Sequence, residues 1–398
     1  RLLKVQNLDT GSFMHDVINS FFEEITNNSE YSNFYEIARK ALIAEADDST
    51  KKTDEIDSSN QEKQEESEKG ELLNNEKANN LQIAEDISAI IEKIINKIID
   101  EKLLNEKNYI FTATEKYKLL VQRLKRIIIK SLKYIIQSLV QSEFRLEGTE
   151  VEFGEKGKYK PIVLNLENGK TVEIIGKIDR IDVAQDENKK YVRIIDYKSS
   201  VKNIDYGNVY AGLQLQLITY LDAVCKIEDF VPAGILYFNL LEQIINSSKK
   251  LSEQEIEQRI KGNFKMKGLI LADVKVAKMQ DTKLEKGMSK IIPAYIDKTG
   301  NFSQKLSNIA TQEEFTKLQN YINKTIKDIS NEIFNGNIEL KPFYKDRKTP
   351  CEYCSYKSMC GFNSGIVKKN YNFVNKLSKD EVLERIENGF IKWKCGAC

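Results

Sequence analysis

The fold of this chain is decided by the stretch TVEIIGKIDRIDVAQDENKKYVRIIDYKSS, residues 171–200. Residues 171–183 and 191–200 are rich in β-forming side chains, and the polar run AQDENKK between them is typical of a hairpin turn. Asp196 and Lys198 stand two positions apart in the second predicted strand, so both side chains project from one face. The hairpin is expected to bring Asp179, from the first strand, beside them.

This acidic strand pair predicts a metal site. Two carboxylates and one ammonium at the end of apolar strands are costly to hold together unless another group compensates them. Mg²⁺ suits a few hard oxygen ligands, polarises a phosphate and lowers the pKa of a bound water, which a nearby lysine can orient or deprotonate. A surface hairpin with ordinary salt bridges stays open as the alternative.

Two further segments surround the strand pair. VYAGLQLQLITYLDAV, residues 209–224, has helical periodicity, with Gln216 and Tyr220 four positions apart on one face. Their polar ends either contact a nucleotide phosphate or hold Lys198, and the alternative is that both side chains only cover the sheet. AGILYFNL, residues 233–240, is expected to be a more buried strand, so the fold class is α/β with a small mixed sheet flanked by helices.

The only histidine, His15, lies in GSFMH on a predicted helix over residues 11–25 that begins at Gly11 or Ser12. A lone histidine is usually structural, but a neutral imidazole is also a good metal ligand. Both interpretations of His15 stay open on the sequence.

The charge of the chain is uneven along its length. The net charge is +1, yet residues 45–78 carry 12 acidic and 5 basic side chains, which leaves an excess of +8 elsewhere. Residues 46–80 are polar and cannot bury enough apolar surface, so a disordered insertion is expected there. Residues 82–105 and 115–143 look like amphipathic helices, and the second is either a solvated face or a DNA-facing stripe that includes Arg123, Lys125 and Arg126.

Several functional classes are not supported by the sequence. No run of about 18 uncharged apolar residues and no signal sequence occur, so we expect a cytoplasmic protein without a membrane partner. No GxxxxGK[ST] motif occurs, so the chain has no phosphate-binding ATPase loop of its own. TQEEFTKLQNYINKTIKDISNEIFNG, residues 311–336, is predicted to be a capped helix with Thr311 as N-cap, Glu314 at the third position and Gly336 as stop.

The motifs taken in order resemble a known family. GSFMH, GKIDRID, DYKSS and LQLQLITY are similar to the RecB-family nuclease domain of the PD-(D/E)xK superfamily. TEVEFG, PAGILYFNL, MKGLILAD and PCEYCSYKSMCGF are similar to the AddB (RexB) subunits of bacterial helicase–nucleases. Each motif alone is weakly specific, but their order along residues 10–363, apart from the insertion, is highly specific.

The resemblance implies a fold and a set of roles. The fold would be restriction-endonuclease-like, with Asp179 and Asp196 binding Mg²⁺ and with His15 and the backbone carbonyl of Tyr197 as further ligands. Lys198 would be the catalytic lysine, supported by Gln216 and Tyr220. The implied activity is exonucleolytic degradation of one unwound DNA strand at double-strand breaks, in a heterodimer with an AddA-type helicase–nuclease subunit that unwinds DNA with ATP.

The cysteines predict a second metal site. Cys351, Cys354 and Cys360 follow a C-x2-C-x5-C spacing, which suits zinc or an iron–sulfur cluster that takes four ligands. The resemblance implies a [4Fe–4S] cluster with one cysteine upstream of the His15 helix, and none precedes Cys225, so we expect that ligand before residue 1. Cys395 and Cys398 are alternative ligands or incidental, and Cys225 is expected to pack in the core.

The sequence therefore predicts five regions and leaves two rival functions. The regions are an N-terminal helix with His15 (1–45), the disordered insertion (46–80), a helical region (81–145), the nuclease core (146–340) and an iron–sulfur clasp with a C-terminal tail (341–398). The rivals are a CRISPR-adaptation nuclease with similar motifs and cysteines, and a nuclease-dead DNA-binding scaffold. The AddB-like flanks disfavour the first, and the intact Asp179, Asp196 and Lys198 disfavour the second.

Overall fold

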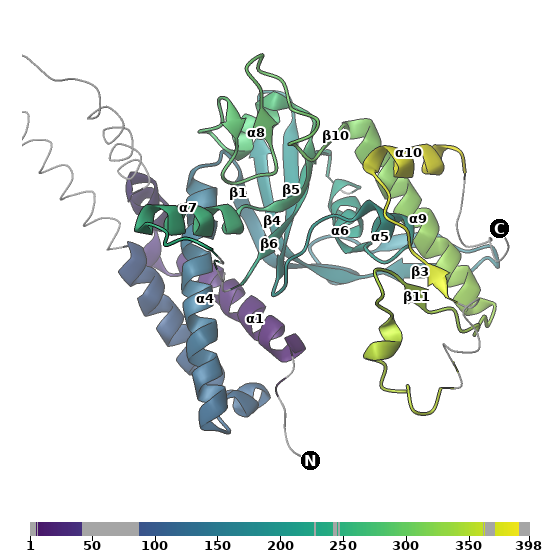
Figure 1. Cartoon of the computed structure of the whole chain (residues 1–398), viewed down its shortest axis with the longest axis horizontal. Coiled ribbons are helices and arrows are strands. Elements are labelled where there is room, and N and C mark those ends of the chain that lie inside the picture. The colour runs from purple at the N-terminus through teal and green to yellow at the C-terminus, as the bar shows by residue number, and fades with distance from the viewer. Residues whose placement is uncertain are drawn as a thin grey trace, which may run out of the picture.

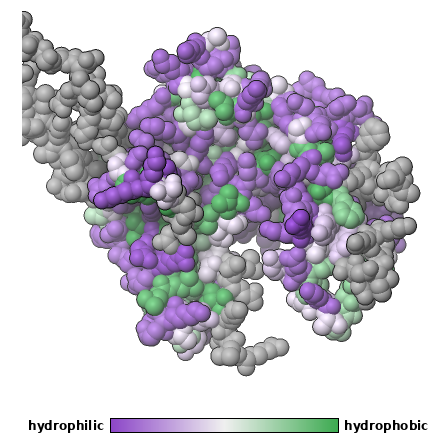
Figure 2. Space-filling model, in the orientation of Figure 1, coloured by the Kyte–Doolittle hydropathy of each residue, from purple (hydrophilic) through white to green (hydrophobic). Residues whose placement is uncertain are grey.

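The computed structural model describes residue 5 and residues 7–41, 87–226, 228–241, 245, 247–360, 362 and 371–389. The predicted disordered insertion at 46–80 and the C-terminal Cys395 and Cys398 lie outside these residues. No helix among the described residues is long and apolar enough to cross a membrane. The face seen in Figure 2 is mostly hydrophilic, with smaller hydrophobic areas between the elements.

A six-stranded sheet forms the centre of the fold, in the order β1-β4-β5-β6-β7-β10. The β5/β6 and β7/β10 pairs are parallel and the other three pairs are antiparallel, so the predicted mixed sheet is confirmed. The strands are β1 (Arg145–Phe153), β4 (Gly176–Gln185), β5 (Lys190–Lys198), β6 (Phe230–Asn239), β7 (Lys267–Leu271) and β10 (Ile309–Ala310).

The predicted hairpin is formed by β4 and β5, but the first predicted strand is too long. Residues 171–183 do not form one strand, because β3 (Thr171–Ile174) pairs with β2 (Ile162–Asn165) in a separate sheet. The chain breaks at Ile175, and β4 then starts at Gly176, where a Cβ atom would lie 2.7 Å from the ring of Phe153. This close approach requires glycine at the start of β4.

Helices cover one face of the sheet (Figure 1). They are α1 (Asn7–Asn27), α4 (Glu115–Val140), α7 (Glu253–Phe264) and two helical segments at 34–41 and 87–103, joined by the short turns η1 (Ser29–Tyr31) and η2 (Glu106–Phe111). Alternate side chains of the strands, such as Tyr197 and Phe238, pack against this layer. The predicted helix over 11–25 exists, but it begins at Asn7 rather than at Gly11.

A second helical layer covers the other face (Figure 1). It contains α5 (Tyr206–Tyr210), α6 (Gln216–Cys225), α9 (Gln312–Phe334) and α10 (Lys379–Glu387), whereas α8 (Val274–Gln280) follows β7 and packs against it. In α9 the predicted Thr311–Glu314 capping box is present, and Gly336 has a left-handed φ of 72° after its end.

The single helix predicted over 209–224 is wrong, because the chain makes two helices there. Gly212 has a φ of 71°, and this left-handed residue ends the first helix. The amide of Gln214 then donates to the carbonyl of Asn203 at 2.9 Å and to the hydroxyl of Tyr237 at 3.0 Å. These bonds hold a connecting loop beside the sheet, and α6 starts afresh at Gln216.

Short strands complete the fold. β8 (Gly287–Met288) pairs with β9 (Tyr295–Ile296), and β11 (Phe343–Tyr344) pairs with β12 (Asn372–Phe373). The ammonium of Lys345, which follows β11, lies 2.6 Å from the carboxylate of Asp205 at the start of α5. The C-terminal region is thereby attached to the helical layer that carries α6.

A buried charge cluster joins β4 and β5 inside the fold. The carboxylate of Asp182 accepts two hydrogen bonds from Arg180, both at 2.7 Å, and one from Arg193 at 2.9 Å. All three side chains are at most 1% exposed. Burial alone would raise the pKa of Asp182, but the two guanidinium groups outweigh it and lower this pKa. Asp182 is thus fully compensated by protein groups.

Candidate active site

The predicted acidic pair meets where β4 and β5 separate. The last paired residues there are Arg180 and Ile195, and beyond them the carboxylate of Asp179 accepts a hydrogen bond from the backbone N–H of Tyr197 at 2.9 Å. The side chain of Asp196 is completely buried, and that of Asp179 is 12% exposed. The two carboxylates therefore lie together at the ends of central strands.

Burial raises the pKa of Asp179 to about 6. Burial, together with the neighbouring charge of Asp179, raises the pKa of Asp196 to about 6 as well. Neither oxygen of Asp196 meets a hydrogen-bond donor in regular geometry, although the ammonium of Lys198 lies 2.6 Å from Oδ2. The pair is under-compensated, in contrast with Asp182, and a cation is the group that would compensate it.

Lys198 belongs to a chain of polar contacts that runs onto α6. Its ammonium donates to Oε1 of Gln216 at 3.2 Å, and the amide nitrogen of Gln216 donates to the hydroxyl of Tyr220 at 2.9 Å. Gln216 is the first residue of α6, so the helix break described above sets its position. The structure therefore brings together Lys198, Gln216 and Tyr220, with Gln216 holding the lysine.

His15 reaches the same place from α1. Its Nδ1 atom lies 3.3 Å from Oδ2 of Asp179, and its ring packs edge-on against Tyr197 with centroids 5.9 Å apart. Burial lowers the pKa of His15, which favours the neutral imidazole that ligates metals. The side chain is 22% exposed and stands at the site rather than in the core.

Glu150 is a further acidic group at the site that the sequence analysis missed. Ligand atoms of His15, Glu150 and Asp179 all lie within 4.8 Å of one another. Glu150 sits on β1 between Thr149, which pairs with Arg180, and Val151, which pairs with Ile178, so it lies opposite Asp179. Its φ of 50° is left-handed, which is uncommon for glutamate, and its carboxylate is 2.9 Å from the ammonium of Lys177.

The donor set fits a hard divalent cation. Two carboxylates, Glu150 and Asp179, converge with the imidazole of His15. The buried Asp196 feels the charge of Asp179, and its carboxylate oxygens have no regular donors. Oxygen ligands dominate this set, as Mg²⁺ requires. Asp179, Asp196, Glu150 and His15 are therefore the residues that would hold the ion.

Two predicted groups lie apart from these residues. On α4, Arg123 and Arg126 are exposed and Lys125 is half-buried, as a solvated or DNA-facing side would be. Cys354 and Cys360 are exposed and Cys351 is half-buried, and none of the three forms a disulfide; Cys351 lies in the short helix η3 (Pro350–Glu352) and the other two follow it. Cys225 is half-buried at the end of α6 and packs against the core, and burial raises its pKa to about 12, as expected for a packing residue.

The family model described as the PD-(D/E)XK nuclease superfamily matches residues 3–361. This chain belongs to the PD-(D/E)XK nuclease superfamily. The α/β fold with a mixed sheet and the clustered Asp179, Asp196 and Lys198 agree with that membership.

Relatives of this PD-(D/E)XK nuclease are named as the B-type subunit of an ATP-dependent helicase/deoxyribonuclease. The protein of Clostridium kluyveri is 37% identical over 303 residues, which are 75% of this chain and 26% of the relative. That of Ruminiclostridium cellulolyticum is 39% identical over 294 residues, 72% of this chain and 25% of the relative. That of Clostridium novyi is 38% identical over 307 residues, 75% and 27% respectively. The chain spans about a quarter of the length of these relatives, and the similarity to AddB-type subunits seen in the motifs is confirmed.

Proposed function

We propose that this chain is the DNA-cleaving part of a helicase–nuclease subunit and that it hydrolyses DNA phosphodiesters with Mg²⁺. The observation that carries the proposal is the under-compensated pair Asp179 and Asp196 next to the ammonium of Lys198. Support also comes from the helicase/deoxyribonuclease subunits to which the chain is similar.

Mg²⁺ would be held by Asp179 and Asp196, with His15, the carbonyl of Tyr197 and Glu150 as further ligands. When bound, the ion supplies a polarised phosphate and a water molecule of lowered pKa. The burial of Asp196 excludes solvent from one side of this site, which strengthens its electrostatic interactions.

Lys198 is proposed as the catalytic lysine. Its ammonium is held between Asp196 at 2.6 Å and Gln216 at 3.2 Å, beside the carboxylates that would hold the ion. From there the ammonium orients the attacking water and offsets the negative charge that develops on the phosphate. Tyr220 fixes the amide of Gln216 and thus acts as a positioning residue.

The wider assembly is part of the same proposal. The cysteines Cys351, Cys354 and Cys360 would hold a [4Fe–4S] cluster, and the basic side of α4 would contact the DNA strand. An AddA-type subunit would supply ATP-driven unwinding, and the nuclease would trim one unwound strand as an exonuclease in the cytoplasm. The nuclease core and the iron–sulfur clasp would have the boundaries predicted for them from the sequence, 146–340 and 341–398.

The decisive experiment compares the wild-type chain with Lys198→Ala. Wild-type protein should degrade end-labelled single-stranded DNA when Mg²⁺ is added and not when EDTA is present. The variant should keep its metal affinity in calorimetry and lose at least about nine-tenths of the cleavage, because removal of a general base or acid commonly costs 10²–10⁴-fold. Cleavage by the variant at the wild-type rate would contradict the assignment of this site.

A further inference from the structure

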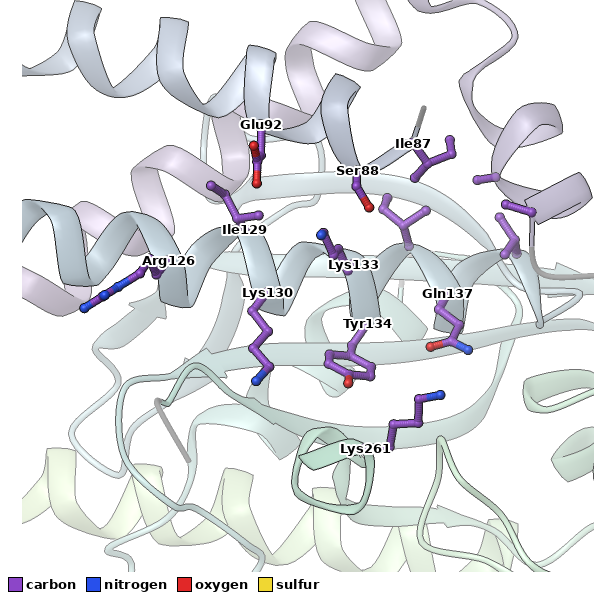
Figure 3. Close-up of a pocket in the computed structure, with 14 residues that line it drawn as sticks. Ile87, Ser88, Glu92, Arg126, Ile129, Lys130, Lys133, Tyr134, Gln137 and Lys261 are labelled. Atoms are coloured by element: carbon purple, nitrogen blue, oxygen red, sulfur yellow. The ribbon is translucent and has the colours of Figure 1, made fainter. Parts of the chain in front are cut away.

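A cavity lies apart from the nuclease site, between α4, α7 and the helix over 87–103 (Figure 3). Its volume is about 570 Å³, within the range of pockets that hold organic ligands. None of the proposed metal ligands and none of the Lys198–Gln216–Tyr220 chain lines it. The cavity is therefore a separate feature of the surface.

The lining of this cavity is strongly basic. Arg126, Lys130 and Lys133 come from α4 at positions i, i+4 and i+7, so they share one side of that helix, and Lys261 joins them from α7. Among the described residues of the lining, Glu92 is the only acidic one. Four cations against one carboxylate make a local positive potential that attracts anions.

An aromatic contact holds together α4 and α7, the two helices that carry the cations of the cavity. The ring of Tyr134 on α4 stacks on that of Phe264 on α7, with centroids 4.3 Å apart and an interplanar angle of 18°. Figure 3 shows Lys130 and Tyr134 extending from α4 toward the part of α7 that carries Lys261. The spacing of the cations is thus set by the fold rather than by flexible side chains alone.

The shape of the basic surface indicates the kind of anion. Arg126 and Lys133 are seven residues apart, about 10 Å along the helix axis, which exceeds the size of one phosphate group. Between the cations the lining is apolar, with Ile129 and Ile136 of α4 and Ile87 opposite them. A chain of phosphates that carries unpaired bases matches both features, because single-stranded DNA offers charges at intervals and apolar base faces.

We propose that this cavity binds a segment of single-stranded DNA, with Lys130, Lys133 and Lys261 on successive phosphates and bases against the apolar lining. The inference deepens the proposed nuclease function and rests on it for the nature of the ligand. It places a DNA contact on α7 as well as on α4, and it extends the contacts of α4 beyond Arg126 toward its C-terminal end.

The test measures binding without cleavage. A labelled oligothymidylate is titrated with the full chain in EDTA, by fluorescence anisotropy, at several salt concentrations. Replacement of Lys130, Lys133 and Lys261 by Gln should weaken binding on the order of tenfold and lower the salt slope by roughly 2, at about 0.7 for each lost phosphate contact. The control replaces the exposed Lys298, Lys305 and Lys324 by Gln, which changes the net charge equally on other elements.

The outcomes separate the two proposals. A lysine variant whose slope equals that of the control overturns the cavity proposal and leaves the nuclease site untouched. Wild-type protein that binds the strand but never cleaves it contradicts the nuclease function and not the cavity. Circular dichroism melts check folding, and replacing the same three lysines by Arg must restore the slope, because only the charge is required. Failure of this rescue also overturns the proposal.

Discussion

Two aspartates three positions apart on β4 have opposite surroundings. Asp182 lies between Arg180 and Arg193 and is fully compensated, whereas Asp179 has a raised pKa of about 6 and no guanidinium partner among the described residues. In the proposed site, the motif GKIDRID thus contains one aspartate that acts on stability and one that would bind the cation.

This contrast predicts different effects for Asp179→Asn and Asp182→Asn. Asp179→Asn should abolish cleavage and weaken Mg²⁺ binding without destabilising the fold, because it removes a carboxylate whose charged form is disfavoured by burial. Asp182→Asn should cost about 3–5 kcal/mol in stability, because it leaves two buried guanidinium groups without a counter-charge. Urea melts and a nuclease assay on both proteins check this, and equal melting midpoints would contradict it.

The raised pKa values predict a pH dependence of stability. Asp179 and Asp196 have pKa values of about 6 in the fold, above the ordinary value near 4. Between pH 4 and 6 the folded state thus binds more protons than the unfolded chain, so the metal-free protein loses stability as pH rises through this range. Asp196→Asn should therefore stabilise the protein above pH 6, on the order of 1–3 kcal/mol, with no gain below pH 4.

Melts of wild type and Asp196→Asn in EDTA from pH 4 to 8 measure this difference. A gain that is the same at every pH would point to packing rather than to ionisation. Added Mg²⁺ should stabilise the wild type and leave the variant unchanged, since the ion binds only the intact folded site.

Residue types at two-residue spacing are enough to predict Asp179, Asp196 and Lys198 as neighbours. Glu150 is missed because its position depends on a left-handed backbone, which strand periodicity does not encode. Glu150 does lie within the TEVEFG stretch that carries the family resemblance. That resemblance could have drawn attention to Glu150, but strand spacing alone does not place it near Asp179.

At the scale of elements, the sequence predicts the wrong bounds for a strand or helix where contacts with other segments determine them. The predicted strand over 171–183 breaks at Ile175 because β3 pairs with β2. The predicted helix over 209–224 ends at the left-handed Gly212, and the bonds of Gln214 to Asn203 and Tyr237 then hold the chain in a loop. By contrast, the start of α9 is predicted correctly because its capping box is local.

A second prediction at this scale concerns DNA binding by the basic side of α4. Replacing Arg123, Lys125 and Arg126 by Gln should weaken binding of single-stranded DNA and flatten the salt slope by about 0.7 for each lost phosphate contact. Their exposed or half-buried positions make a large folding defect unexpected. An unchanged slope in anisotropy titrations would identify this side of α4 as solvated surface.

At the scale of the whole molecule, the cysteines are expected to act on stability. A cluster held by Cys351, Cys354 and Cys360 and by a fourth ligand far from them in sequence would close a very long loop, comparable to a long disulfide worth roughly 4–5 kcal/mol. Alanine at any of the three should remove the visible iron–sulfur absorbance, lower the melting temperature and reduce cleavage indirectly.

The matched control is the double variant Cys395→Ser/Cys398→Ser, which should keep its iron content. Loss of iron in this control would assign the C-terminal pair to the cluster and contradict the expected upstream ligand. Iron retained after Cys354→Ala would argue against the cluster site itself.

The position of His15 on α1 has a consequence for the order of synthesis. The ribosome completes α1 about 170 residues before it completes β5, an interval of roughly 10–35 s at 5–20 residues per second. During that time Phe13, Val17 and Phe21, which end fully buried, have only the other helices to cover them. The helices α1 and α4 are therefore available to pack together before β5 exists, and His15 is without Asp179 and Asp196 until the β4–β5 hairpin is made.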